Sequence, residues 1–383
     1  DVVASYEQAR QNVYYKGRFT HIARVELSSD GGVDFFLDTP YQNLALLLDI
    51  PIVKASEVTA DTPLGTGPYS RVVNWWCSSD DLVAKDSSIA LVEAESPSQI
   101  RDEFEFSGLS VVCTNPQTDS YADYRCDFEL WEVDSGFMMY IGCNVTYSKF
   151  FDDGTLRTFL TYGIDRQTLV DDNYGGLALP TTLPISPMSP YYSKSLATNY
   201  DYDEMRFIDA ASKFRVPTND KGVPRTLQLL VNSDDSARLR CARNIAATLT
   251  ELGLACETVE SPTSVYEARL QAANYDIYLG ITKLPTTADL SEFYRPWGEM
   301  SWGGLANETI YNMVNQSLAD RGNYYNLHKL VADDGRIIPV MAGYYAIYAK
   351  RGVLSYLNPA RDNVFYYTLG KTMESSKVAT QFS

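Results

Sequence analysis

The spacing of apolar positions along the chain predicts alternating helices and strands. Val2, Tyr6 and Ala9 recur at near-helical spacing, so a helix is expected at the start of the chain. A chain that begins inside a helix, and without Met, leads us to expect further residues upstream. Residues 22–27 and 33–37 alternate apolar and polar positions around a Gly-Gly turn, which predicts a β-hairpin.

The middle of the chain continues this mixture with less regular periods. The pattern predicts a strand at residues 71–76, a helix at 97–104, a strand at 109–113 and one amphipathic helix at 156–170. Prolines mark residues 175–192 as an extended segment that runs on the surface, because proline cannot continue a helix or a central strand.

Two further strands are predicted at residues 127–133 and 137–145, on either side of an Asp-Ser-Gly turn. Paired as a tight hairpin, they would set Cys126 opposite Cys143, close enough for a disulfide. This pairing is one option, because a register shift of one residue would separate the two thiols. Buried free cysteines are an equally good interpretation of the six Cys in the chain.

The clearest local pattern lies in the second half, where three apolar strands alternate with two amphipathic helices. The segments are, in order, residues 226–231, 236–252, 254–259, 265–273 and 275–281. This β-α-β-α-β order predicts a parallel sheet with right-handed crossovers. Helices at residues 308–318 and 325–331 then lead to a strongly apolar strand at 336–349.

Open parallel sheets bind ligands beyond the carboxyl ends of their strands. The loop after the third strand, residues 282–304, is therefore the expected ligand-facing segment. The candidate ligand contacts in it are Lys283, Asp289, Tyr294, Arg295, Trp297 and Trp302. The aromatic rings would stack on a ligand and the charged groups would orient it. An equally good interpretation is that the two Trp side chains only close the end of the sheet.

Composition narrows the class of protein. The 383 residues are too many for one ordinary core and suit two or three lobes. Hydrophobic residues make up 45% and charged residues 21%, as in a soluble globular protein. The net charge of −17 repels phosphate backbones, which argues against a nucleic-acid partner. No stretch approaches the roughly 18 consecutive apolar residues of a membrane span.

The sequence contains no recognisable catalytic or metal motif. Neither His21 nor His328 has a GxSxG motif nearby, so a Ser/His/Asp triad is not indicated. The cysteines form no CxxC pair. Adjacent carboxylates such as Asp234 and Asp235 lie at predicted helix ends, where capping explains them. We therefore predict a protein that is not an enzyme and that has no cofactor and no metal site.

Short motifs in a fixed order resemble one bacterial family. Residues 64–69 (LGTGPY) resemble its xGTGPY motif, and residues 156–166 (LRTFLTYGIDR) resemble VRQALSYAIDR. The match continues at residues 1–6, 174–176, 229–235, 275–277 and 337–340. By these motifs the chain resembles the bacterial extracellular solute-binding proteins of family 5, the oligopeptide, dipeptide and nickel binders of ABC importers.

The resemblance implies an α/β, two-lobed periplasmic-binding-protein-like fold of type II, in the cluster of the oligopeptide binders. The first lobe would comprise residues 1–147, completed by 343–383, and the second lobe residues 148–342. The resemblance also implies a protein outside the bacterial cytoplasmic membrane, secreted or lipid-anchored on its outer face. Its partners would be a peptide or small-molecule ligand and an ABC permease in the membrane, and we expect a monomer.

Two departures from the family pattern affect these expectations. Family members carry a longer stretch before the segment where this chain starts, and that stretch builds the usual N-terminal part of the first lobe. We expect either that the sequence is a fragment or that its first lobe is reduced. Peptide binders also carry an acidic residue in an ADYxDP stretch, which pairs with the α-amino group of the peptide. Residues 282–289 (TKLPTTAD) replace that stretch, and Asp289 is displaced by a few positions. Lys283 would favour an anionic group instead.

The expected function is that of an ABC importer's substrate-binding component, which captures an oligopeptide or similar small polar solute between two lobes and delivers it to a permease. The alternative is a degenerate solute-binding fold that acts as a sensor or interaction protein without transport cargo. A hydrolase acting in the same cleft is the least supported hypothesis, because no activated nucleophile is visible.

Overall fold

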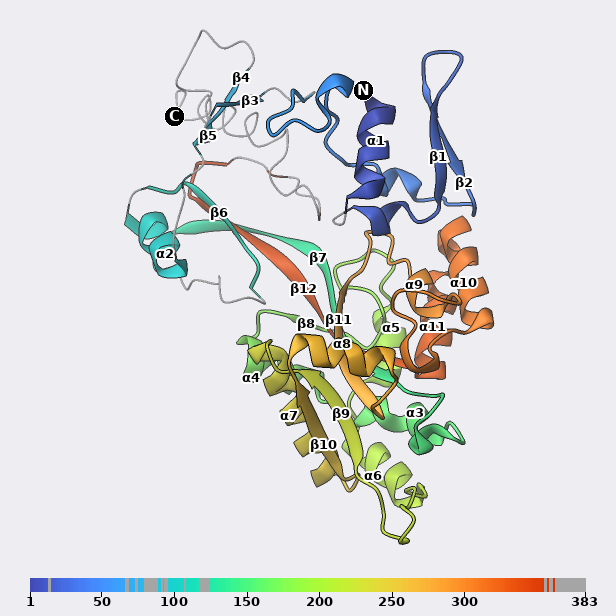
Figure 1. Ribbon diagram of the computed structural model, residues 1–383. Helices are drawn as coiled ribbons and strands as arrows, with labels where there is room; N and C mark the ends of the chain where they lie inside the picture. The colour runs from blue at the N-terminus through green and yellow to red at the C-terminus, as the bar shows by residue number, and fades with distance from the viewer. Residues whose placement is uncertain are drawn as a thin grey trace. The chain divides into compact units, whose positions relative to one another are not determined.

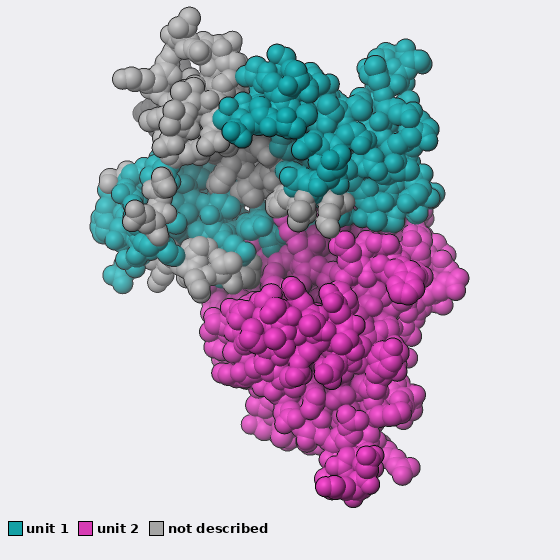
Figure 2. All heavy atoms as spheres, in the orientation of Figure 1, with its two compact units in different colours: residues 1–135, 345–383 teal, residues 136–344 magenta. Residues whose placement is uncertain are grey.

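The computed structural model contains two compact units, which Figure 2 shows in different colours. One unit comprises Asp1–Ser135 and Tyr345–Ser383, and the other comprises Gly136–Tyr344. The chain passes between them inside strand β7 (Phe128–Cys143) and again inside strand β12 (Ile337–Lys350) (Figure 1). The structure describes residues 1–12, 15–65, 69–72, 75–78, 89–90, 92, 96–106, 108–116, 124–354, 357 and 361.

The first unit begins with the predicted helix and hairpin, and both are confirmed. Helix α1 (Val2–Gln11) lies against the antiparallel pair β1 (Ile22–Leu27) and β2 (Val33–Leu37). The Tyr6 ring anchors this contact, because it meets the rings of Phe19 and Phe35 edge-on at centroid distances of 5.6 and 5.0 Å. A short 3-10 helix at Lys16–Phe19 lies between α1 and β1, and two more follow the hairpin at Leu44–Leu47 and Ala55–Glu57.

The rest of the first unit differs from the prediction at one strand. Instead of one strand at residues 71–76, the structure has β3 (Tyr69–Val72) and β4 (Trp75–Ser78), which pair antiparallel, and β4 pairs in turn with β5 (Ile89–Ala90). Helix α2 (Pro97–Phe106) confirms the predicted helix. Strand β6 (Val111–Thr114) pairs antiparallel with residues 346–349 of β12. Residues 66–68 of the LGTGPY segment lie outside the described residues.

The second unit contains the predicted parallel arrangement. Strands β9 (Leu227–Asn232), β10 (Cys256–Ser261) and β11 (Ile277–Lys283) pair in parallel in the order β10-β9-β11. Helices α7 (Ser236–Glu251) and α8 (Thr263–Gln271) connect them. Strand β11 also pairs antiparallel with β7, so the sheet is mixed, which the sequence pattern did not predict.

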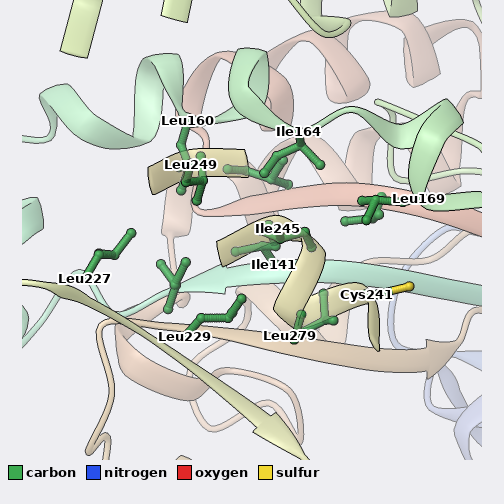
Figure 3. Close-up of a cluster of buried hydrophobic side chains, with 14 of the residues drawn as sticks. Ile141, Leu160, Ile164, Leu169, Leu227, Leu229, Cys241, Ile245, Leu249 and Leu279 are labelled. Atoms are coloured by element: carbon green, nitrogen blue, oxygen red, sulfur yellow. The ribbon is translucent and has the colours of Figure 1, made fainter. Parts of the chain in front are cut away.

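One face of this sheet carries the main apolar core of the second unit. Helix α7 begins at the predicted position, where the Asp235 carboxylate accepts a hydrogen bond from the Arg238 amide at 3.0 Å. It directs Cys241, Ile245 and Leu249 onto the strands (Figure 3). The partner side chains from the strands and from the segment before α7 include Ile141, Leu160, Ile164, Leu169, Leu227, Leu229 and Leu279 (Figure 3).

On the opposite face, two large rings face two glycines across neighbouring strands. Tyr278 of β11 pairs in register with Gly142 of β7, and Gly280 of β11 pairs with Tyr140 of β7. Both tyrosines are buried, and their hydroxyl oxygens lie 3.3 Å apart. Each ring therefore lies in the space that the absent side chain of the opposite glycine leaves.

The predicted hairpin of residues 127–145 is wrong, because β7 is one continuous strand of 16 residues. Cys126 and Cys143 consequently lie at opposite ends of the strand, and the disulfide option is wrong as well. The cysteines whose side chains the structure describes are free: Cys113, Cys126, Cys143, Cys241 and Cys256. Pairing with β11 along residues 137–143 accounts for the extended course, since this ladder replaces the turn that the Asp-Ser-Gly sequence suggested.

The single helix predicted at residues 156–170 is also wrong. The structure has α3 (Thr155–Phe159), a 3-10 turn (Leu160–Gly163) and α4 (Arg166–Tyr174). The helix breaks because Ile164 is extended (φ −105°, ψ 98°) and Asp165 then caps a new helix by accepting from the Thr168 amide. This break directs the Arg166 side chain into the interior of the unit, where it is fully buried.

The prediction that the proline-rich segment runs on the surface is wrong for part of its length. Residues 181–186 are all buried, and β8 (Leu179–Pro180) pairs with residues 341–342 of β12. The burial is possible because carbonyl groups of the segment find donors inside the protein. The Arg166 Nε donates to the Thr181 carbonyl at 3.1 Å, and the Thr181 hydroxyl donates to the carbonyls of Leu183 and Ile185.

The remaining helices of the second unit are α5 (Lys194–Ala197), α6 (Glu204–Lys213), α9 (Ser291–Tyr294), α10 (Glu308–Ala319) and α11 (Tyr324–Asp334). Further 3-10 turns lie at Lys149–Phe151, Thr198–Tyr200, Trp302–Gly304 and Arg321–Asn323. Helices α10 and α11 and strand β12 confirm the predicted elements at the end of the chain. In the described part of the chain, no helix is long and apolar enough to cross a membrane.

His328 on α11 gives the second unit a predictable dependence on pH. Its ring is fully buried beside Tyr324, neither ring nitrogen has a hydrogen-bond partner among the described residues, and burial lowers its pKa to about 4. The unfolded chain, with an ordinary His pKa near 6.5, therefore binds the proton first as the pH falls. We expect the free energy of unfolding to drop by on the order of 2–3 kcal/mol between pH 6.5 and 4 from this group alone.

Urea denaturation across that pH range, compared with the His328→Leu variant, tests this expectation. Carboxyl groups titrate in both proteins, so the difference between them isolates the histidine. The free energy of unfolding of the variant should fall less steeply with decreasing pH than that of the wild type. At pH 5 it should equal or exceed the wild-type value. Parallel stability curves for the two proteins would contradict the assigned environment of His328.

Candidate functional site

The candidate site is built at the carboxyl end of β11. There Lys283 pairs in register with Phe137 and Thr282 with Met138, and the Leu284 amide donates to the Gly136 carbonyl at 2.8 Å. The loop after β11 therefore starts beside the residues through which β7 enters the second unit. A ligand at this edge would meet both the loop and one of the two segments that connect the units.

The carboxyl ends of β9 and β10 are closed by a network of short polar contacts. The Asn232 amide nitrogen donates to the Thr263 hydroxyl at 3.0 Å, and the Asp234 carboxylate accepts from the Thr263 amide at 2.9 Å and from its hydroxyl at 2.7 Å. These hydrogen bonds lower the pKa of Asp234. Because the network serves the start of α8, it indicates a structural role, and the β11 loop remains as the ligand-facing part of this edge.

The six predicted ligand contacts fall into different environments. Lys283 is exposed at the end of β11. Asp289 is half-buried, and its carboxylate accepts from the Ser291 amide at 2.8 Å, just before α9. Tyr294 is fully buried, and burial raises the pKa of its hydroxyl well above the ordinary value. Its ring has no surface on which a ligand could stack, so it supports the loop from inside.

The other three predicted contacts lie further along the loop. Arg295 is half-buried and forms a two-pronged ion pair with Glu292, with N–O distances of 2.8 to 3.1 Å, which raises the pKa of Arg295. Trp302 is half-buried at the start of a 3-10 turn. Trp297 is 95% exposed, the largest value among the bulky apolar side chains that the structure describes. The structure thus brings Arg295 and Trp297 together in one turn and places Tyr294 in the core.

Trp297 adopts a backbone conformation that is rare for its type, with a φ of +61°. For any residue other than glycine, this left-handed conformation costs roughly 1–2 kcal/mol. The turn is closed by a hydrogen bond of 3.2 Å from the Gly298 amide to the Arg295 carbonyl. Pro296 and Trp297 are its central residues, and turns of this form favour glycine at the position of Trp297.

Sequence reasoning missed three residues that hold this turn. Glu292 pairs with Arg295 and also accepts from the Glu299 amide at 2.9 Å. Gly298 approaches the Glu292 carbonyl so closely that a Cβ would lie 2.2 Å from its oxygen. Met300 places its sulfur 3.2 Å from the Thr282 hydroxyl, which ties the loop back to β11. The available signals were the Glu-x-x-Arg spacing and the Pro-x-Gly sequence, which predicts a turn.

Possible metal ligands do not cluster among the described residues, and several of the thiols are buried. No group of three or more His, Cys, Asp or Glu side chains in the described part of the chain comes together as metal ligands would. Burial raises the pKa of Cys113 to about 11 and of Cys241 and Cys256 to about 12, so these thiols are protonated and weak nucleophiles at neutral pH.

Solved structures with the same fold are two-lobed periplasmic binding proteins. A putative peptide binding protein, AppA, from Clostridium difficile superposes with a TM-score of 0.73 at 14% identity, over 95% of this chain and 82% of that one. The ABC transporter substrate binding protein CtaP from Listeria monocytogenes gives 0.71 at 16% identity, over 97% and 83%. NikA from Brucella suis, in complex with Fe(III)-EDTA, gives 0.68 at 16% identity, over 94% and 81%.

The chain has the two-lobed fold of the periplasmic binding proteins. The sequence profile of the bacterial extracellular solute-binding proteins, family 5 (middle part), matches residues 89–304, which is more than half of the chain. The protein therefore belongs to this family of solute-binding proteins of ABC importers. No curated protein matches the chain significantly.

Proposed function

We propose that this protein is the substrate-binding component of an ABC importer and that it takes up an oligopeptide or a similar small polar solute. The observation that carries the proposal is the position of the β11 loop. It starts at Lys283, beside the strand that connects the two units, and it presents Trp297 to solvent. A solute bound here would contact a segment that has to adjust when the units move, which couples binding to a change of shape.

Each predicted contact would recognise a different chemical group of the solute. Lys283 favours an anionic group of the solute, and Trp297 and Trp302 offer faces for stacking. Arg295 and Asp289 already bind Glu292 and the Ser291 amide, so they orient the loop and offer their remaining hydrogen-bonding capacity to the solute. The partner that receives the solute would be a membrane permease, with the binding protein a monomer outside the cytoplasmic membrane, secreted or lipid-anchored.

Native mass spectrometry of the protein purified without refolding tests this function. We expect a co-purified mass in the peptide range that disappears on denaturation. Trp297→Ala and Trp302→Ala should each lower the bound fraction about tenfold, as loss of a stacking surface predicts. Tyr325→Ala, which removes another exposed aromatic ring on α11, should leave the bound fraction unchanged.

A protein without bound solute that also fails to bind peptides from a defined casein digest would contradict import of peptides. That result would favour the second hypothesis, a sensor or interaction protein that keeps the fold without cargo. The hydrogen bond that Asp289 accepts from the Ser291 amide is consistent with it, because it engages the acidic residue nearest to the position that pairs with the peptide amine in the family.

A further inference from the structure

The turn that carries Trp297 is held from both sides by one carboxylate. Glu292 binds the Arg295 side chain before the turn and the Glu299 amide after it, and its own carbonyl accepts from the Met300 amide at 3.1 Å. Gly298 fits under this arrangement only because it lacks a Cβ. We call residues 292–300 the Trp297 clasp. The clasp fixes the position of Trp297 before any ligand arrives.

The conformation of Trp297 does not serve the stability of the fold. Its ring is 95% exposed and therefore gains little from packing, while its backbone has the left-handed conformation that glycine adopts more easily. A glycine at this position would relieve the strain and remove an exposed apolar surface. Strained residues that a rigid surrounding keeps in place are concentrated at binding sites.

The charge around the clasp indicates what the ring would bind. In the loop of residues 282–304 three residues are acidic (Asp289, Glu292 and Glu299) and two are basic (Lys283 and Arg295). The charge of Arg295 is compensated by Glu292, so the loop has a net charge of −1. The whole chain carries a net charge of −17. The face of a Trp ring attracts cations more strongly than any other aromatic side chain, and a negative surrounding strengthens that attraction.

We propose that the Trp297 clasp is a preformed recognition element for a cationic group of the solute, such as the ammonium or guanidinium of a basic peptide side chain. This inference rests on the proposed function and names the substrate class within it. The cation would lie on the face of Trp297, and Glu292 would act as a positioning residue that keeps the ring in place. Because the loop already has its bound conformation, binding does not lose conformational entropy in ordering it.

Calorimetric titration with three pentapeptides tests the inference. The peptides are Ala-Ala-X-Ala-Ala with Lys, Leu or Glu at the central position. We expect the Lys peptide to bind the wild type about tenfold more tightly than the Leu peptide, and the Glu peptide to bind weakest. Trp297→Gly should abolish the preference for Lys and raise the melting temperature by about 1 °C, since the relieved strain exceeds the entropy that glycine adds to the unfolded chain.

Two further variants separate recognition from structure. Trp297→Phe keeps an aromatic face and should retain part of the preference for Lys. Glu292→Gln weakens the ion pair with Arg295 and should reduce that preference without changing the affinity for the Leu peptide. Such a selective change would not follow from a merely structural role of Glu292.

The outcomes distinguish the inference from the function on which it rests. If the wild type binds the peptides without preferring Lys, or if Trp297→Gly leaves the preference intact, the inference is wrong and the proposed function stands. If none of the three pentapeptides binds to the wild type, the proposed uptake of peptides is wrong and the inference fails with it. A melting temperature of Trp297→Gly below that of the wild type would contradict the claim that Trp297 lowers the stability of the fold.

Discussion

Replacing Gly142 with Ala should lower the free energy of unfolding by about 3 kcal/mol or more, at the upper end of what overpacking costs. A Cβ at this position would lie 2.2 Å from the ring of Tyr278, its partner across the sheet. That ring cannot retreat, because Tyr278 is fully buried and meets the rings of Tyr140 and Tyr275 edge-on at centroid distances of 5.7 and 5.2 Å. Strain must therefore spread into β7 or β11.

Urea denaturation followed by far-UV circular dichroism measures this loss. Gly17→Ala is the matched control, because a Cβ there meets no atom within 4 Å. Tyr278→Ala should be destabilising by itself, but in its background Gly142→Ala should cost almost nothing, since the ring that it would strike is gone. Additive effects of the two substitutions would show that the close approach of ring and glycine is not the cause.

The sequence was sufficient to predict elements whose periodicity is local. The β-α-β-α-β run from β9 to β11 was recognised because each segment carries its own apolar face and its own end signals, such as Asp235 at the start of α7 and Gly253, with a φ of +99°, after its end. The antiparallel pairing of β11 with β7 could not be predicted, because it joins residues about 140 positions apart and depends on the reciprocal Tyr and Gly positions.

Failures of the prediction cluster where distant groups satisfy the backbone. The helix break at Ile164 and the burial of residues 181–186 both depend on Arg166, whose acceptors come from segments far apart in the chain. A pattern of apolar residues does not report such bonds, since a charged residue is normally assigned to the surface. The apolar residues predicted around residue 160 are buried, but they lie on two short helices and a 3-10 turn instead of one helix.

For the candidate site, the sequence suggests a location, which stays a prediction, but it does not give the arrangement of the side chains. The rule that ligands bind beyond the carboxyl ends of parallel strands selects the loop after β11. It does not distinguish Tyr294 from Trp297, two aromatic residues three positions apart, of which one is fully buried and the other 95% exposed. The difference arises from the turn at Pro296, which carries the chain away from the short helix α9.

Replacing Arg166 with Met should lower the free energy of unfolding by about 4 kcal/mol, the largest effect that we predict for a single side chain. The Arg166 Nε donates to the carbonyls of Thr181 (3.1 Å) and Pro339 (2.9 Å), and its Nη1 donates to those of Thr161 and Ile164 (both 3.3 Å). Met fills a similar volume but removes the guanidinium donors from the buried carbonyls of Thr181, Pro339 and Ile164, whereas the Thr161 carbonyl still accepts from the Ile164 amide. Burial lowers the pKa of Arg166 to about 10, so the guanidinium is still charged at neutral pH.

Two matched variants test whether geometry or charge is responsible, again by urea denaturation. Arg166→Lys keeps the charge but should recover little stability, because one ammonium cannot reach acceptors on both sides of a planar guanidinium. Arg243→Ala removes an exposed two-pronged pair with Glu260 and should change the stability far less, because solvent screens this pair. A fully stable Arg166→Lys protein would show that charge alone suffices. If it is destabilised like the Met variant, the Ile-Asp-Arg motif that resembles the family serves to hold three segments of the second unit together rather than to bind the solute.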